Sequence, residues 1–232
     1  MKYVVYPKSP NAHHIRLLWH TFFAMPGESR DLTVASNFES RSICGLQSRH
    51  HGTMRSESDS PSTTITLRHP DSRDAGSVWR LVRACAALDD NSLYCNLLQC
   101  DHFSETCVVA EREPDGEVVG WVSAYVPPDE PGVLFVWQVG VHPDARGMGL
   151  ARRMLRSLIA RDACAEIRQL QATITADNGA SWALFSSLAR EYARGGKLER
   201  QPHYGEDDHF EGRHATEHLV TLDFGKGLRI AA

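Results

Sequence analysis

One stretch of this 232-residue chain constrains its fold more than any other. Residues Val133–Val141 (VLFVWQVGV) form an almost unbroken apolar run, which a His-Pro-Asp turn and the glycine-containing segment Arg146–Ala151 (RGMGLA) follow. An apolar run of this length, bounded by turn residues, is typical of a strand that is buried on both faces of a sheet. A buried strand that leads through a tight turn into an amphipathic helical pattern predicts an α/β fold.

The rest of the chain from residue 64 onward alternates between strand and helix patterns. Strands are predicted at Ile65–Arg68, Thr106–Glu111, Glu117–Val126, Leu170–Ile174 and Glu217–Phe224. Helices are predicted after Asp71 or Ser72, within Asn91–Cys100, at Arg152–Arg161 and at Asn178–Arg190, where Gly195 and Gly196 end the last one. The polar segment Glu199–Arg213 is predicted to be a loop. Helices between strands imply a central sheet flanked by helices.

The first 62 residues differ from the rest. They are rich in Ser, His and Arg, and they show no sustained period of 2 or 3.6 residues. A segment of this kind buries too little apolar surface to offset the entropy lost on ordering. We therefore expect residues 1–62 to be a disordered or non-native extension and residues 63–232 to form the folded domain. One hypothesis is that translation begins at Met54, which the mass of the native protein would test.

Charge and cysteine content exclude several classes of protein. The net charge is −4, and no apolar run approaches the ~20 residues that span a bilayer. We therefore expect neither nucleic acid nor a membrane as partner. None of the six cysteines forms a CxxC pair, and the twelve histidines show no metal-ligand spacing. We interpret the cysteines as reduced and structural, expect the protein to be cytoplasmic, and expect no metal site.

The turn before the helix has the chemistry of a phosphate cradle. A helix N-terminus presents unsatisfied N–H groups and a partial positive charge. Gly147 and Gly149 allow the main chain to approach a pyrophosphate closely, and Arg146 adds a positive charge. The alternative is an ordinary strand-to-helix turn. The segment is neither a P-loop nor a dinucleotide fingerprint, since GK[ST] and GxGxxG are both absent.

The pattern Arg146-x-x-Gly149-x-Ala151 resembles the acetyl-CoA motif of the GNAT acetyltransferase superfamily, Gln/Arg-x-x-Gly-x-Gly/Ala. The resemblance implies a GNAT-type acyl-CoA N-acyltransferase fold, a mixed sheet flanked by helices, with acetyl-CoA as co-substrate. Asn178 opens a helix where the superfamily often places an Asn that contacts the cofactor. The cofactor contacts that the resemblance implies are Val139, Val141, Arg146, Gly147, Gly149, Leu150, Ala151 and Asn178.

Within the superfamily, the core resembles the diaminobutyrate acetyltransferases of ectoine synthesis. The matching segments are Leu88-Asp89-x-Asn91-Ser92-x-Tyr94, Cys100-x-His102-Phe103-x-x-Thr106-Cys107, Phe135–Val139, Ala172–Ile174, Asn178-x-x-Ser181–Phe185 and His214-x-x-Glu217. They are scattered over residues 88–217, a span of about 130 residues, whereas the first 62 residues have no counterpart. The resemblance implies acetylation of the γ-amino group of L-2,4-diaminobutyrate and a homodimeric enzyme.

A small zwitterionic diamine needs acidic groups to hold the ammonium that must not react. The resemblance places Asp89 and Glu217, together with Trp137, around the substrate. Each has a simpler interpretation: Asp89 as a helix cap, Glu217 as an exposed strand residue and Trp137 as a core side chain. His214 is a candidate to bind the carboxylate, to position the amine or to take its proton, and it also has a purely structural interpretation.

The expected reaction is direct acetyl transfer in a ternary complex. Glu217, His214 and Asp89 are the candidate bases that free the γ-amine of its proton. Backbone N–H groups near residues 137–139 would stabilise the oxyanion, at a splay between strands that the superfamily resemblance implies. Many superfamily members protonate the leaving thiolate with a Tyr on the helix that Asn178 opens. Here that place holds Phe185, so Tyr94 is the substitute candidate.

Two alternatives remain open at this stage. The same fold serves other small amines and peptides, because a fold does not determine its substrate. A non-catalytic acyl-CoA sensor would keep the cradle and lose the chemistry, which the absence of a Tyr at position 185 permits.

Overall fold

The central sheet is mixed, as expected. The computed structural model describes residues 64–85, 88 and 91–225, which belong to the compact unit Ser58–Ala232. Its strands, in the spatial order β1-β2-β3-β4-β5-β7-β6, are β1 (Ile65–Arg68), β2 (Val108–Arg112), β3 (Glu117–Tyr125), β4 (Val133–Val141), β5 (Gln169–Thr175), β7 (Glu217–Asp223) and β6 (Glu199–Tyr204). Only β4 and β5 run parallel among these neighbours. The expectation for residues 1–62 falls outside the described part of the chain.

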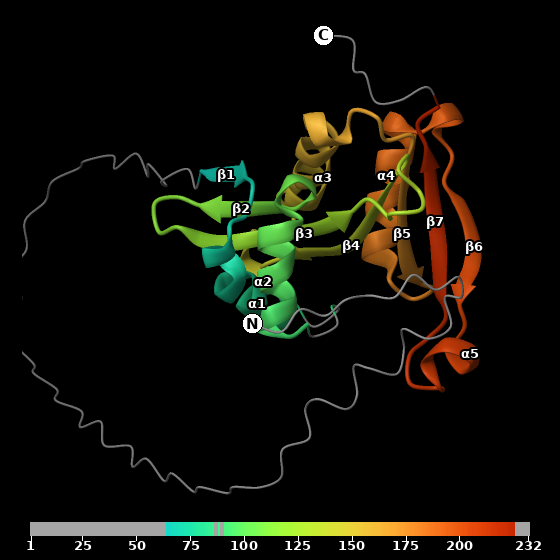
Figure 1. Ribbon diagram of the computed structural model, residues 1–232, viewed down its shortest axis with the longest axis horizontal. Helices are drawn as coiled ribbons and strands as arrows, with labels where there is room; N and C mark the ends of the chain where they lie inside the picture. Colours follow the sequence, from blue (N-terminus) through green and yellow to red (C-terminus); the bar gives the residue numbers. More distant parts are fainter. Residues whose placement is uncertain (1–63, 86–87, 89–90, 226–232) are drawn as a thin grey trace, which may run out of the picture. The chain divides into compact units, whose positions relative to one another are not determined.

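Helices cover both faces of the sheet (Figure 1). On one face, α1 (Ala75–Ala84) and α2 (Leu93–His102) enclose a core around the buried Trp121. On the other, α3 (Leu150–Ile159) and α4 (Gly179–Tyr192) pack on a larger core that includes Met154 and Phe185. The helices that the sequence predicts are therefore confirmed, with bounds shifted by a few residues.

A side-chain cap sets where α2 begins, and another caps the 3₁₀ turn that precedes α1. Ser92 Oγ accepts a hydrogen bond from the backbone N–H of Cys95 at 3.1 Å, at the start of α2. Asp71 caps a short 3₁₀ turn, Ser72–Asp74, that leads directly into α1. Such caps satisfy N–H groups that a helix leaves without an intrahelical partner.

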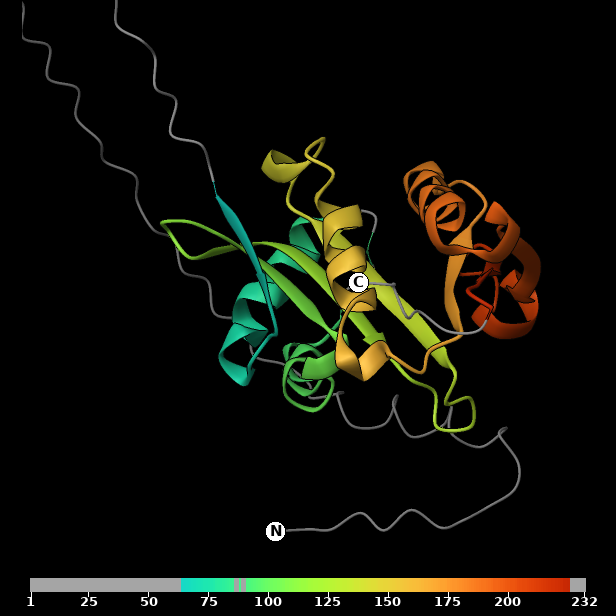
Figure 2. The same cartoon turned by 90° about the horizontal axis from the view of Figure 1, so that it is seen from above.

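The sheet divides in the middle. β4 pairs with β5 only over Val133–Phe135, opposite Gln169–Gln171, whereas β5 continues against β7 as far as Thr175. The remainder of β4 therefore diverges from β5, and Figure 2 shows the two halves of the sheet separating. The splay that the superfamily resemblance implies is present in this chain.

The prediction that Glu199–Arg213 is a loop is wrong. This segment contains the edge strand β6 and the short helix α5 (Glu206–Phe210). Every residue of β6 is exposed, so the strand has no apolar alternation, and backbone pairing with β7 holds it instead. Pro202 is tolerated because it lies on an edge strand beside a register shift.

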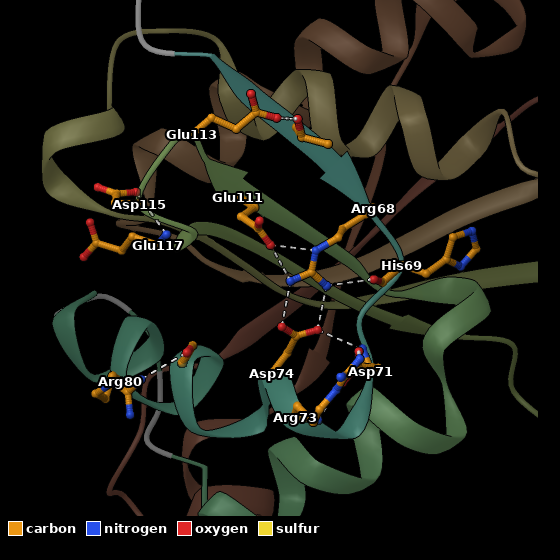
Figure 3. Close-up of polar contacts among 12 residues, drawn as sticks. Arg68, His69, Asp71, Arg73, Asp74, Arg80, Glu111, Glu113, Asp115 and Glu117 are labelled. Carbon is orange, nitrogen blue, oxygen red and sulfur yellow. Dashed lines mark hydrogen bonds and ion pairs between the residues drawn. The ribbon is translucent and has the colours of Figure 1, made fainter.

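An ion-pair cluster joins the first strand to the turn before α1 (Figure 3). The Arg68 guanidinium donates to both carboxylate oxygens of Asp74, at 2.7 and 2.8 Å, and to Glu111 Oε2 at 2.6 and 2.8 Å. The hydrogen bonds to Asp74, more than those to Glu111, raise the pKa of Arg68. Bidentate pairing of this kind fixes β1, β2 and the 3₁₀ turn relative to one another.

Candidate active site

A cavity of about 550 Å³ opens where β4 and β5 diverge. Both halves of the sheet, α2, α4 and the β6–β7 connection contribute to its wall. Its aromatic lining residues are Phe103, Tyr125, Phe135, Trp137, Phe185, Tyr204 and Phe210. Its polar lining residues are Gln99, Ser123, Gln138, Thr173, Asn178, Ser181, His214 and Glu217. Five of the predicted site residues meet here: Trp137, Val139, Asn178, His214 and Glu217.

A β-bulge turns Trp137 toward this cavity. Val136 and Gln138 pair with the adjacent β3 residues Ala124 and Ser123, so Trp137 has no counterpart on β3. Its side chain is 48% exposed, and the interpretation of Trp137 as a core residue is therefore wrong. A bulge re-aims a side chain and interrupts the ladder of backbone hydrogen bonds. The backbone at Trp137 is therefore unpaired with β3.

His214 and Glu217 face each other in the cavity wall. His214 Nε2 lies 3.7 Å from Glu217 Oε1, and His214 Nδ1 lies 2.7 Å from the carbonyl oxygen of Ala215. A carbonyl only accepts, so Nδ1 carries the hydrogen in this contact. In the neutral ring, Nε2 then keeps its lone pair. The pair thus combines a potential proton acceptor with a carboxylate.

The glycine-rich turn has the geometry of an anion site. Gly147 and Gly149 adopt φ values of +77° and +67°, and a Cβ added at either would meet nothing within 4 Å. Gly149 is the N-cap of α3, no side chain caps that helix, and its first turn contains no acidic residue. The first N–H groups of α3 therefore have no side-chain cap, and the two glycines leave room beside the main chain, as a bound phosphate requires.

The other predicted cradle residues have distinct surroundings. The side chain of Leu150 is buried in the core, so only its main chain is available to a ligand, and Ala151 is half-buried. Arg146 Nε lies 3.4 Å from the carbonyl oxygen of Val141, a long contact that holds the guanidinium at the end of β4. Val141 does not line the described cavity.

Asn178 and Phe185 place α4 against the cavity. Asn178 Oδ1 accepts from the backbone N–H of Ser181 at 3.1 Å, which leaves the amide nitrogen of Asn178 available to a ligand. The buried ring of Phe185 also lines the cavity, one helical turn beyond Ser181. Phe185 occupies the expected place on the helix and has no proton to donate.

Of the residues predicted for catalysis and substrate binding, one lies outside this cavity and one falls outside the described residues. Tyr94 is 64% exposed on α2 and does not line it, and Asp89 lies outside the described residues. Two other tyrosines, Tyr125 and Tyr204, do line it, and burial raises the pKa of the Tyr125 phenol. They were missed because no motif marks them: one ends a strand with a core pattern, and the other lies in the segment predicted to be a loop.

Sequence reasoning also missed a buried polar wall beneath α2. Gln99 and Ser123 are almost completely buried, yet Gln99 Nε2 and Ser123 Oγ have no hydrogen-bond partner. A buried polar group without a partner costs about 1–3 kcal/mol, so its presence calls for an explanation. The available signal was the occurrence of Asn96 and Gln99 on the buried face of a short helix.

Three features combine in this region: an open glycine turn before a helix, a split between parallel strands, and a cavity that contains a carboxylate–imidazole pair. A split sheet beside an anion-binding turn defines an acyl-CoA-dependent N-acetyltransferase fold. The Acetyltransferase (GNAT) family profile matches residues 76–189. Among the described residues, no helix is long and apolar enough to cross a bilayer.

Several curated proteins are similar to most of the chain. The L-2,4-diaminobutyric acid acetyltransferase of Vibrio cholerae is 46% identical over 162 residues, which is 70% of this chain and 91% of that protein. The enzyme of the same name from Halomonas elongata is 40% identical over 158 residues, which is 68% and 80% of the two chains. The chain therefore belongs to the L-2,4-diaminobutyric acid acetyltransferase family of GNAT enzymes.

A solved structure agrees with this assignment. It is diaminobutyrate acetyltransferase EctA from Paenibacillus lautus, in complex with its substrate L-2,4-diaminobutyric acid and coenzyme A. It aligns with a TM-score of 0.66 and 35% identity, and the alignment covers 72% of this chain and 99% of that one. The GNAT fold that the sequence predicts is confirmed.

Proposed function

We propose that this protein transfers the acetyl group of acetyl-CoA to the γ-amino group of L-2,4-diaminobutyrate, as a step of ectoine biosynthesis. The products are Nγ-acetyl-diaminobutyrate and CoA. One observation carries the proposal: the cavity at the split of β4 and β5 contains the His214–Glu217 pair and lies in a chain of the diaminobutyrate acetyltransferase family.

The residues present fit acetyl-CoA. Main-chain N–H groups of residues 147–151 and the guanidinium of Arg146 would hold the pyrophosphate, because this turn is open, uncapped and free of acidic side chains. The edge of β4 at Val139 and Val141, which has no β5 partner, and the amide of Asn178 would hold the arm that carries the thioester. Acetyl-CoA supplies the activated acetyl group, and the protein supplies orientation and charge.

The proposed substrate contacts come from acidic and aromatic groups. Glu217 pairs with the α-ammonium, and Asp89 is the second carboxylate predicted for that task. Trp137, turned into the cavity by the bulge, packs against the carbon chain of the substrate. Holding the α-ammonium leaves the γ-amine as the group that reacts.

His214 is the proposed base. Its Nδ1–H group donates to the Ala215 carbonyl, so Nε2 is the nitrogen that takes the proton from the γ-ammonium. The Glu217 carboxylate at 3.7 Å stabilises the imidazolium that results. The neutral amine then attacks the acetyl carbonyl, the new C–N bond forms, and the C–S bond breaks. Backbone N–H groups at residues 137–139 stabilise the oxyanion.

The CoA thiolate leaves with the bonding electron pair and takes up a proton, while the acetylated nitrogen gives up its second proton, so that the net reaction releases one proton. Tyr94 is the donor that the sequence predicts, and the pocket tyrosine Tyr204 is its competitor. We also propose that the protein is a homodimer, since α2 exposes Leu93 and Tyr94 on its surface. The proposal that it is cytoplasmic is supported by the described cysteines, which are free thiols. Light scattering of the purified protein measures its oligomeric state, and a monomeric mass would contradict the dimer.

The deciding experiment measures CoA release with acetyl-CoA and L-2,4-diaminobutyrate, ornithine, lysine or a lysine peptide, with NMR to locate the acetyl group. We expect diaminobutyrate to have the highest kcat/KM and to be acetylated on its γ-nitrogen. Preference for another amine would assign the site to a different acetyltransferase. Binding of CoA without turnover of any amine would favour the alternative that the protein is a non-catalytic acyl-CoA sensor.

A further inference from the structure

A pair of uncharged hydrogen-bond donors lies in the cavity wall opposite the His214–Glu217 pair. Gln99 comes from α2 and Ser123 from β3, on the β4 side of the split, whereas His214 and Glu217 come from the β7 side. Gln99 is 2% exposed and Ser123 is 1% exposed. Their burial matters because a hydrogen bond in a water-excluded wall is stronger than one at the surface.

A hydrogen bond from Asn96 orients Gln99. Asn96 Nδ2 donates to Gln99 Oε1 at 2.9 Å, a contact between two buried side chains. The amide oxygen of Gln99 is thereby occupied, and its nitrogen remains as a donor without a partner.

Ser123 is placed by the sheet rather than by a side-chain hydrogen bond. It is the Cα partner of Gln138 across the β3–β4 ladder, so the two side chains lie on the same face of the sheet. Gln138 accepts from Asn91 at 2.9 Å, whereas Ser123 Oγ has no partner. Of these two neighbouring side chains, Gln138 is already hydrogen-bonded, whereas the hydroxyl of Ser123 is available to a ligand.

The described cavity lining contains no Lys or Arg, and its only acidic side chain is Glu217. An amino-acid substrate brings a carboxylate into this cavity as well as an ammonium. The ammonium is attracted to Glu217, and the carboxylate is repelled from that side. Available donors on the far wall are the groups that can receive it.

We infer that Gln99 Nε2 and Ser123 Oγ form the subsite that holds the α-carboxylate of the amino-acid substrate. This inference rests on the proposed function. With the ammonium at Glu217 and the carboxylate at Gln99 and Ser123, both substituents of the α-carbon are held, and the side-chain amine extends toward the split of the sheet. The subsite thereby selects amino acids over plain diamines.

The test compares L-2,4-diaminobutyrate with 1,3-diaminopropane, which is the same molecule without its carboxylate. Steady-state kinetics are measured for the full-length wild type, Gln99→Leu, Ser123→Ala and the control Cys95→Ala, which alters α2 at a residue outside the cavity lining. We expect each cavity variant to lose about 10- to 100-fold in kcat/KM for diaminobutyrate. For diaminopropane we expect kcat/KM to stay within about twofold.

An equal loss on both substrates, or no loss on diaminobutyrate, would overturn the inference. Thermal unfolding of each variant identifies a loss that comes from misfolding, and Ser123→Thr, which restores the hydroxyl, separates the lost donor from lost packing. Failure of the proposed function has a different signature, since the wild type would then not acetylate diaminobutyrate. In that case the amino acid that the wild type prefers and its decarboxylated amine would replace diaminobutyrate and diaminopropane in the assay. The same comparison of kcat/KM values would then test the carboxylate subsite.

Discussion

His214 Nε2 lies 3.7 Å from Glu217 Oε1 in the wall of the cavity, while the other ring nitrogen of His214 is engaged by the Ala215 carbonyl oxygen. Residues three apart in sequence are brought together here because His214 ends a connection and Glu217 begins β7. One group is suited to accept a proton, and the other to hold a positive charge.

Removing the charge of Glu217 tests this division of roles. Glu217→Gln keeps the shape of the side chain, and we expect kcat/KM for diaminobutyrate to fall by about 100-fold, because a charge-assisted hydrogen bond to the ammonium is worth roughly 1.5–3 kcal/mol. We expect His214→Gln to lower kcat instead, with activity partly recovered at alkaline pH, where the free amine is more abundant. CoA binding by calorimetry is the control. Unchanged kinetics in both variants would remove the pair from the site.

The phosphate cradle depends on a left-handed backbone at Gly149. Gly149→Ala forces a Cβ onto a residue with φ +67°, which costs about 1 kcal/mol or more. A Cβ there meets nothing within 4 Å in the protein itself, so we expect the fold to survive. The KM for acetyl-CoA should rise about tenfold while the KM for diaminobutyrate changes little. An equal rise in both KM values would contradict a cradle at this turn.

Two tyrosines are candidates for the proton donor to the CoA thiolate: Tyr94, which the sequence suggests, and Tyr204, which the cavity lining suggests. Tyr94 is outside the described cavity lining, whereas Tyr204 lines it. We expect Tyr204→Phe to lower kcat by at least about fivefold and Tyr94→Phe to leave kcat within about twofold. If Tyr94→Phe has the larger effect, the sequence-based prediction of Tyr94 as the proton donor is restored. Single-turnover kinetics show whether the loss is in the chemical step.

The Arg68 cluster should contribute to stability rather than to activity. Arg68→Met leaves Asp74 and Glu111 without their cation, so we expect the free energy of unfolding to fall by about 1–3 kcal/mol. Arg73→Met removes an exposed ion pair with Asp71 and should cause no measurable change. Urea denaturation of both variants measures the difference. Equal stability of the two would show that burial adds nothing to the Arg68 interactions.

The buried thiols give a prediction for alkaline pH. Burial raises the pKa of Cys100 and of Cys107 to about 12, against about 8.5 for an exposed thiol. Their contribution to stability is complete below pH 8.5, because both states are then protonated, and it is lost as pH rises toward 12. We expect the free energy of unfolding to decrease between pH 8.5 and 10.5. Iodoacetamide mapping at pH 8 should leave both thiols unmodified, and rapid labelling would contradict their burial.

The sequence by itself determined the elements that carry a strong local pattern. The apolar run Val133–Val141 coincides with β4, and Asn178 caps α4 as its position predicts. The glycine turn at Gly147 and Gly149 follows from residues that tolerate positive φ. These features depend on residues that are close in sequence, so the local sequence pattern is enough to predict them.

Only the tertiary structure decided the features that depend on distant partners. Every residue of β6 is exposed, so its sequence has no apolar alternation. The strand forms because its backbone pairs with the edge of β7. In the sequence, Trp137 has the pattern of a core residue, but the bulge opposite Ser123 and Ala124 directs its side chain into the cavity. Gln99 and Ser123 become a pair of donors only when α2 packs over the sheet. Burial and register arise from chain segments far apart in sequence, and for that reason local patterns do not contain them.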